Sequence, residues 1–319
     1  MSAADSIYWI KAQRRAASMQ PDVQLAVLRA FRLIRESLSE SQLARIIATG
    51  NLDALLDQAF RQAVMDTAFQ PVRDQIRRSV GQSVTYYAKQ IAIPASLPGV
   101  TIAFDVLSPH VITGIRSLET KVIGDLQTDV RETVRAFVEN GLRDGVGPRA
   151  IARDLRTVVG LGPSQLQQVD NLRDALLGQN GRSVTDYTLR DKRFDRTIAK
   201  GNLTPDKIDK MVDAYRKQRI AQNAETVSRT AVLDAQKLGQ HLAVQDAISK
   251  GVYDPNRLMK TWRGVLDSRE RELHLEQEGS TVAWDQPYPG TGEIIPGSST
   301  YNCRCVSIYR QRPVQRAAA

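Results

Sequence analysis

The chain has few cysteines, few aromatic residues and no long apolar run. Only two of its 319 residues are cysteines, Cys303 and Cys305, and a single residue separates them. A disulfide across so short a span would be strained, so we expect two reduced thiols in a protein that stays in the cytoplasm. Aromatic residues make up 6% of the chain, which favours a core of aliphatic side chains packed between helices.

The sequence also lacks the signals of a membrane or secreted protein. No apolar stretch reaches the ~18–20 residues that a helix needs to cross a bilayer, so we expect no membrane segment. The N-terminus, M-S-A-A-D-S-I-Y-W-I-K, has neither the basic start nor the apolar core of a signal peptide. The formal net charge of +9 favours contact with a polyanion, most commonly nucleic acid. Solvated surface arginines explain the same charge without any such partner.

Hydrophobic spacing and the positions of proline and glycine predict four consecutive segments. The fold class we predict is mainly α, with an extended helical body and a small, loop-rich C-terminal α+β module. The predicted segments are an N-terminal helical module over residues 1–90, a linker with a short strand over 91–110, a helical docking body over 111–250, and a C-terminal module with a basic tail over 251–319.

Local signals refine the first two of these segments. Apolar residues recur at helical spacing from Pro21 to Leu38, and we expect helix breaks near Pro71 and around Gly81. The stretch V-T-I-A-F-D-V in the linker is β-prone, so the short strand is expected there.

Chemically capable residues gather between Lys260 and Arg310. His274 follows Asp267 by seven residues, so a helix would place both side chains on one face. Cys303 and Cys305 would point to the same side of an extended strand. Two thiolates, an imidazole and a carboxylate are a sufficient tetrahedral set for zinc, although C-x-C is tighter than the usual zinc-finger spacing.

Other interpretations of these residues remain open. The cysteines and His274 can be core residues with satisfied hydrogen bonds. Asp267, Arg269 and Arg271 can form an ion-pair network that fixes a loop. A Cys–His pair can also act as nucleophile and base, as in a hydrolase, but the sequence shows no oxyanion site to accompany it. We therefore expect a protein that is not an enzyme, with a Cys–His hydrolase as the alternative.

The N-terminal helices carry a second group of candidate residues. Arg73, Arg77 and Arg78 lie close together in a basic, helical stretch. Guanidinium groups on one helix can follow the phosphates of a nucleic acid, which makes these arginines candidate nucleic-acid contacts. Solvated helix faces explain them equally well.

Ten residues of the C-terminal segment form one ordered motif: Trp262, Asp267, Arg269, Arg271, His274, Gly279, Asn302, Cys303, Arg304 and Cys305. In this order they resemble the C-terminal signature of phage Mu protein F-like minor head proteins, also called phage head morphogenesis proteins. The upstream helix V-S-R-T-A-V-L-D-A-Q-K-L-G-Q is similar to the helix that leads into this signature, and weaker similarity extends the resemblance over roughly residues 100–310.

The resemblance implies a minor capsid protein of a tailed bacteriophage. Such a protein would associate with the portal vertex or the head interior and assist head assembly, with a role in DNA packaging or genome ejection. Its implied partners are the portal protein, the major capsid or scaffold protein, and packaged double-stranded DNA. It would lie in the virion head, and in the host cytoplasm during assembly. The alternative from the residues alone is a nucleic-acid-binding module.

Overall fold

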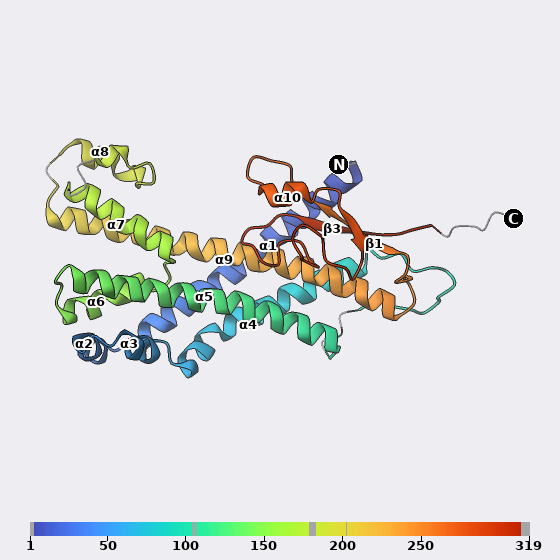
Figure 1. The fold of residues 1–319 in the computed structure, drawn as a ribbon, viewed down its shortest axis with the longest axis horizontal. Coiled ribbons are helices and arrows are strands. Elements are labelled where there is room, and N and C mark those ends of the chain that lie inside the picture. The colour runs from blue at the N-terminus through green and yellow to red at the C-terminus, as the bar shows by residue number, and fades with distance from the viewer. Residues whose placement is uncertain (1–2, 104, 106, 179–182, 202, 314–319) are drawn as a thin grey trace. The chain divides into compact units, whose positions relative to one another are not determined.

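The structure, a computed structural model, describes residues 3–103, 105, 107–178, 183–201 and 203–313. These residues are mainly helical, and their only strands lie near the C-terminus, which confirms the predicted fold class (Figure 1). The last residues of the predicted basic tail, 314–319, lie outside the description. The α-helices are α1 (Ala3–Ser37), α2 (Glu40–Ala48), α3 (Leu52–Ala59), α4 (Gln62–Ala88), α5 (Pro109–Arg143), α6 (Pro148–Val158), α7 (Pro163–Leu177), α8 (Asp195–Ala199), α9 (Pro205–Ser249) and α10 (Glu272–Glu276).

The remaining elements are short. Two 3₁₀ helices, η1 (Val184–Asp186) and η2 (Lys192–Phe194), precede α8, and the strands are β1 (Leu258–Arg263), β2 (Thr281–Ala283) and β3 (Val306–Gln311). Among the described residues, no helix is both long and apolar enough to cross a bilayer.

The helix α4 does not break where the sequence predicts. It continues through Pro71 and Gly81, and α1 likewise continues through Pro21. A proline removes one backbone donor and crowds the preceding turn, but tertiary packing can outweigh that local cost. Here the neighbours Phe69 and Val72 are fully buried, so packing on both sides of Pro71 holds the helix together.

The β-prone run of the linker forms no strand in its described residues. Phe104 and Val106, in the middle of that run, lie outside the description. The run is tied to the end of α9 by side chains instead. Lys250 Nζ donates to the carbonyl of Thr101 at 2.7 Å, and Asp246 Oδ2 accepts from the amide of Ala103 at 3.2 Å. A strand needs a neighbouring strand to share its backbone hydrogen bonds, and these side-chain contacts replace one.

The chain forms two compact units, each assembled from separate stretches of sequence. Unit 1 contains residues 1–24, 72–122 and 226–319, and unit 2 contains residues 25–71 and 123–225. The boundaries fall within α1, α4, α5 and α9.

Unit 2 is helical in its described residues and packs α2 against α6. Gly160, in the turn between α6 and α7, has a φ of +99°, which lies in the left-handed region. A Cβ on Gly160 would come within 2.7 Å of the Phe31 ring, so only glycine fits there. The Gly160 carbonyl accepts from Asn223 Nδ2 at 3.0 Å, which ties this turn to α9.

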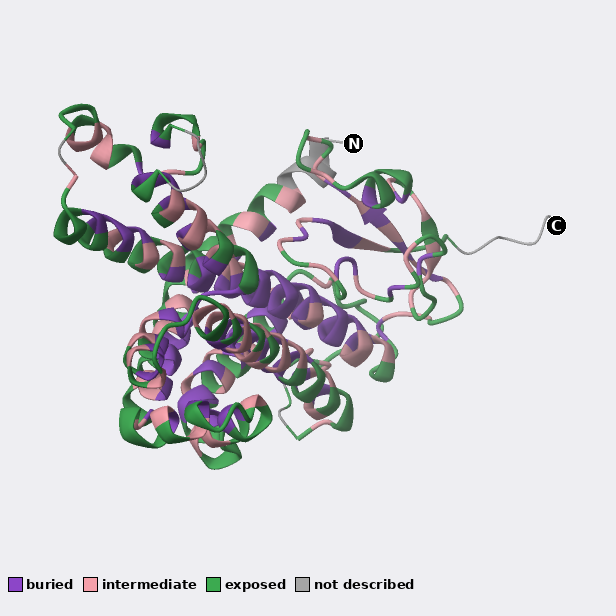
Figure 2. Cartoon of the chain, turned by 60° about the vertical axis from the view of Figure 1, so that its left-hand side comes forward, coloured by how far each residue is buried: buried purple, intermediate pink, exposed green. Residues whose placement is uncertain are grey.

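Unit 1 is organised around the second half of α9. From Thr226 onward most α9 residues are buried, and Figure 2 shows this part of the helix as an almost continuous buried band. A helix covered on nearly every side lies inside its unit. At Gly239 a Cβ would lie only 2.4 Å from Cβ of Ser83 in α4, so a glycine permits the close approach of these two helices.

The C-terminal sheet lies beside this half of α9 (Figure 1). Its order is β2-β1-β3 with antiparallel pairing, and Trp262 faces Ser307 across β1 and β3. Gln240 Nε2 donates to the Ser307 carbonyl at 2.9 Å, and His241 Nδ1 lies 2.9 Å from the Tyr309 hydroxyl. Polar side chains of α9 therefore fix β3 against the helix.

Candidate metal centre

His274, Cys303 and Cys305 converge in the C-terminal module. His274 lies in α10, and the two cysteines lie on the segment that enters β3. Each Sγ is 3.6 Å from Nδ1 of His274, and the three ligand atoms all lie within 4.8 Å of one another. All three side chains are buried. The structure thus brings together three of the four predicted metal ligands in an arrangement that can hold a metal ion.

Aromatic rings form one wall of this cluster. Trp262 is fully buried and meets the ring of His274 edge-on, with ring centroids 5.3 Å apart. It meets Tyr288 in the same manner at 5.0 Å. Trp262, Tyr288 and the two cysteines form one buried cluster. Apolar walls exclude water and strengthen the electrostatic interactions among the polar groups inside.

The fourth predicted ligand, Asp267, is engaged with arginines. Its two carboxylate oxygens accept from Arg304 at 2.6 and 2.5 Å, and Arg269 donates to it at 3.2 Å. The hydrogen bonds from Arg304 hold the pKa of Asp267 well below its usual range. Arg271, placed with Asp267 and Arg269 in the network alternative, instead donates to the carbonyl of Tyr301 at 2.8 Å.

Glu270 occupies the position beside the thiols. The Cys305 thiol donates to Oε1 of Glu270 at 3.1 Å. The other carboxylate oxygen, Oε2, accepts from the amide of Leu266 at 2.6 Å, where the backbone turns through a left-handed φ of 59°. Sequence reasoning missed Glu270; a helix over residues 270–274 would place it on one face with His274, but α10 begins only at Glu272.

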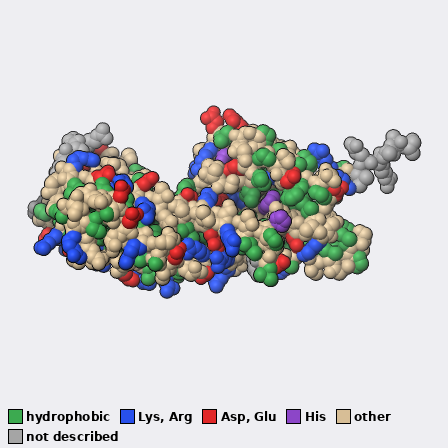
Figure 3. All heavy atoms as spheres, turned by 60° about the horizontal axis from the view of Figure 1, so that its bottom comes forward, with side chains coloured by type: hydrophobic (Ala, Val, Ile, Leu, Met, Phe, Trp, Pro, Cys, Tyr) green, Lys and Arg blue, Asp and Glu red, His purple; other side chains and the backbone are tan. Residues whose placement is uncertain are grey.

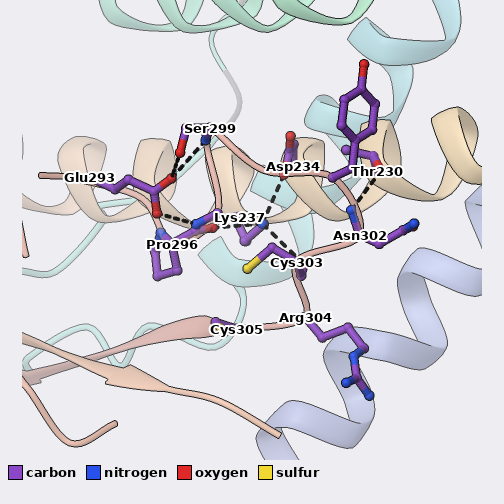
Figure 4. Close-up of polar contacts among 12 residues, drawn as sticks. Thr230, Asp234, Lys237, Glu293, Pro296, Ser299, Asn302, Cys303, Arg304 and Cys305 are labelled. Carbon is purple, nitrogen blue, oxygen red and sulfur yellow. Dashed lines mark hydrogen bonds and ion pairs between the residues drawn. The ribbon is translucent and has the colours of Figure 1, made fainter. Parts of the chain in front are cut away.

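Lys237 connects the cysteine segment to α9 (Figure 4). Its Nζ donates to the Pro296 carbonyl at 2.8 Å and to the Cys303 carbonyl at 3.5 Å. It also pairs with Asp234 at 2.9 Å, and both side chains are buried, with 5% and 7% exposed. A buried ammonium is stable only with such partners, so this lysine fixes the loop at one geometry. No feature of the sequence around Lys237 predicts this role.

Further contacts hold the N-C-R-C residues. The amide of Asn302, whose φ is 55°, donates to Oγ1 of Thr230 in α9 at 3.0 Å (Figure 4). The Arg304 carbonyl accepts from Trp9 Nε1 at 2.9 Å and Gln13 Nε2 at 3.4 Å, both in α1. The cysteine segment is thus held by two helices of unit 1 before any metal is considered.

The two thiols differ in their pKa values. A hydrogen bond from Cys305, the charge of Lys237 and a hydrogen bond with His274 lower the pKa of Cys303. The hydrogen bond to Cys303, burial and the neighbouring Glu270 raise the pKa of Cys305. Cys303 is therefore the more acidic thiol of the pair, and a thiolate is the form of cysteine that binds metals.

His241, which lies outside this cluster, should make the protein less stable at acid pH. Burial, reinforced by the charge of Lys260, lowers the pKa of His241 to about 4. The unfolded chain, with a histidine pKa of about 6.5, takes up the proton first. The free energy of unfolding should therefore fall as pH drops below about 6.5, by roughly 3 kcal/mol between pH 8 and pH 4. Urea unfolding at both pH values measures this loss.

The matched variant is His241→Gln, which has no titrating ring. The difference between its loss and that of the wild type isolates the histidine from carboxylates that titrate in both proteins. Equal losses would contradict the assignment to His241.

Of the three arginines predicted to contact nucleic acid, two line the same hollow in the structure. Arg77 pairs with Glu119 of α5 at 2.6 Å. Arg77 and Arg78 both line a hollow of about 600 Å³ between α1 and α4, together with Arg15, whereas Arg73 is not among its lining residues.

Comparison with known proteins connects this geometry to a family. A family model described as Phage Mu protein F like protein matches residues 132–308, which is more than half of the 319 residues. The matched region ends within β3 and includes His274, Cys303 and Cys305. No match was found among curated proteins or among solved structures. The chain belongs to the phage Mu protein F-like family of phage head morphogenesis proteins.

Proposed function

We propose that the protein is a minor component of the phage head that docks at the portal vertex or the head interior and assists head assembly. The observation that supports this role is the family match over residues 132–308, which spans helices α6 to α9 and most of the C-terminal module. The portal protein and the major capsid or scaffold protein are its proposed partners. It would act in the host cytoplasm during assembly and remain in the virion.

Mass spectrometry of purified virions and procapsids tests this role. The chain should be present in both, and chemical cross-linking should join it to the portal protein. Heads assembled without the portal protein serve as the control, since a portal-docked protein should be missing from them. Virions without the chain would overturn the proposal, and equal amounts with and without the portal protein would overturn the portal docking.

We also propose that His274, Cys303 and Cys305 hold a zinc ion that stabilises the C-terminal module. Thiolate and imidazole are ligands that zinc prefers. The ion would join α10 to the segment before β3, in a module whose described residues form three short strands. Elemental analysis should find about one zinc per chain, and Cys303→Ser should lose both the zinc and thermal stability. Metal-free wild-type protein of unchanged stability would overturn the proposal.

The burial of these groups also supports a role without catalysis. Cys303 and His274 each expose 3% of their surface, and Cys305 exposes 2%. A catalytic thiol needs a partly exposed, reactive thiolate. A thiol reagent should therefore label the unfolded chain and leave the native, metal-free protein unlabelled. Rapid labelling of one native cysteine would favour the Cys–His enzyme instead.

A contact with packaged double-stranded DNA is the second candidate function, and the hollow between α1 and α4 supports it. Its lining contains Arg15, Arg77, Arg78 and Lys89 and no acidic residue. Arg78 and Lys89 have no ion-pair partner among the described residues, and the Arg15 guanidinium lies 3.7 Å above the Tyr86 ring centroid. On the face drawn in Figure 3, Lys and Arg are interspersed with Asp and Glu.

The salt dependence of duplex binding tests this candidate. The logarithm of the binding constant should fall with the logarithm of salt concentration by about 0.9 for each phosphate contacted. Replacing Arg78 and Lys89 with glutamine should lower that slope by about 1–2. As a control, Arg32→Gln changes a paired arginine of unit 2 and should leave the slope unchanged. A flat salt response in the wild type would remove the DNA contact.

A further inference from the structure

The identity of the fourth ligand decides what kind of zinc site this chain builds. Two cysteines and one histidine leave one position of a tetrahedral zinc ion unfilled. A water molecule there is typical of catalytic sites, whereas a fourth protein ligand is typical of structural ones.

The three cysteine and histidine atoms already lie at coordination spacing. With zinc–sulfur bonds of about 2.3 Å and zinc–nitrogen bonds of about 2.0–2.1 Å, a tetrahedron has sulfur–nitrogen edges of roughly 3.5 Å. The structure places Nδ1 of His274 3.6 Å from Sγ of Cys303 and 3.6 Å from Sγ of Cys305. These atoms need almost no rearrangement to accept the ion.

We propose that Glu270 is the fourth ligand and closes the coordination shell, an inference that rests on the zinc ion proposed above. A zinc–oxygen bond of about 2.0–2.2 Å gives sulfur–oxygen edges of roughly 3.6 Å in the same tetrahedron. Oε1 of Glu270 lies 3.1 Å from Sγ of Cys305, where it accepts the thiol proton. Replacement of that proton by the ion requires these two atoms to separate by a few tenths of an ångström, and the carboxylate must also move towards Cys303 and His274, because Glu270 is not part of the group of ligand atoms that all lie within 4.8 Å of one another.

Two glycines leave space for atoms of the proposed ligands. A Cβ on Gly264 would lie 2.0 Å from Oε1 of Glu270, and a Cβ on Gly297 would lie 2.2 Å from Sγ of Cys303. Any larger residue at either glycine would occupy the space of a ligand atom. The amide of Leu266 binds Oε2 of Glu270, which leaves Oε1 for the ion and makes the carboxylate a single-oxygen ligand.

The net charge of a zinc site with Glu270 as its fourth ligand is opposite to that of the neighbouring charged groups. Zinc with two thiolates, one carboxylate and a neutral imidazole carries a net charge of −1. Beside it, Lys237 and Lys121 share the single carboxylate of Asp234 at 2.9 and 2.7 Å, a group with a net charge of +1. A buried charge is stable only when it is compensated. Asp267, the ligand expected from the sequence, is neutralised by Arg304 instead.

Cobalt substitution distinguishes Glu270 from Asp267. The full chain, freed of metal by a chelator, is loaded with Zn²⁺ or Co²⁺ in the wild type and in three variants: Glu270→Gln, Asp267→Asn and Glu272→Gln. The visible bands of Co²⁺ depend on the number and type of its ligands. Glu270→Gln should alter these bands and weaken metal binding by more than the ~10–100-fold that loss of a supporting residue costs. Asp267→Asn and the exposed control Glu272→Gln should keep the wild-type bands.

A variant that gains a spectroscopic signal must be folded, so such a variant controls for a loss of metal binding that is caused by unfolding. Glu270→Cys should create a site with three thiolates, whose stronger sulfur-to-cobalt charge-transfer absorption reports the third sulfur directly. Asp267→Cys should not. If Asp267→Cys gives the additional absorption and Glu270→Cys does not, Glu270 is not the ligand although the zinc site stands. A wild-type chain that binds neither Zn²⁺ nor Co²⁺ overturns the zinc proposal itself and this one with it.

Discussion

Replacement of Lys237 with methionine should lower the free energy of unfolding by about 3–5 kcal/mol, the usual cost of removing one partner of a buried ion pair. The methionine leaves the carboxylate of Asp234, which is 7% exposed, with Lys121 as its remaining partner. It also leaves the Pro296 carbonyl without its donor. Because Lys121 keeps half of the charge compensation, we expect a loss near the lower end of that range. Urea unfolding followed by circular dichroism measures the loss.

Two further variants complete this experiment. The double variant Asp234→Asn with Lys237→Met removes both buried charges and should recover part of the stability, since only an unpaired charge carries the full penalty. Arg32→Met breaks an exposed pair with Glu36, in which both side chains are more than 60% exposed, and should cost less than about 1 kcal/mol. A loss for Lys237→Met no larger than for Arg32→Met would show that the buried pair does not stabilise the unit.

Replacement of Trp262 with alanine should cost about 3–5 kcal/mol, because the indole is fully buried between His274 and Tyr288 and would leave a cavity. Trp262→Phe should cost less than half as much. The indole Nε1 has no hydrogen-bond partner among the described residues, so phenylalanine removes an unsatisfied donor while it keeps an aromatic ring in place. Urea unfolding and near-ultraviolet circular dichroism measure both variants.

Trp284 supplies the matched control. It is only partly buried and lies with its ring centroid 6.0 Å from that of His241, outside the cysteine cluster. Trp284→Ala should therefore cost clearly less than Trp262→Ala. If the two alanine variants lose equal stability, or if Trp262→Phe is as damaging as Trp262→Ala, the cluster around Trp262 is not the core of the module.

Rare residues were the part of the site that the sequence could predict. His274, Cys303 and Cys305 are distinctive by type and order, and they do converge. Glu270 is one of several charged residues in S-R-E-R-E-L-H-L-E, where an exposed position is the ordinary expectation. Only the turn at Leu266, with its φ of 59°, directs the Glu270 carboxylate to the thiols, and no local pattern announces such a turn.

Long-range packing accounts for the other differences. Lys237 has the sequence environment of an ordinary helix lysine, and it is buried because a loop some sixty residues later covers it, as its hydrogen bond to Pro296 shows. Pro71 and Gly81 are helix-breaking signals on any local scale, yet α4 passes through both. Helix periodicity therefore predicted the fold class, while the contacts that fix individual elements depend on residues distant in sequence.

The assembly of unit 1 from three separate stretches has a consequence for synthesis of the chain. About a hundred residues separate its second stretch, which ends at residue 122, from its third, which begins at residue 226. At ~5–20 residues per second, the ribosome needs roughly 5–20 s to cover that distance. During this time the faces of α1 and α4 that α9 will cover stay open to solvent and to other chains. Closure of the unit over α1 and α4 must then wait until the stretch beyond residue 226 has emerged, and its histidine and cysteines can converge only later, after residue 305 has been made.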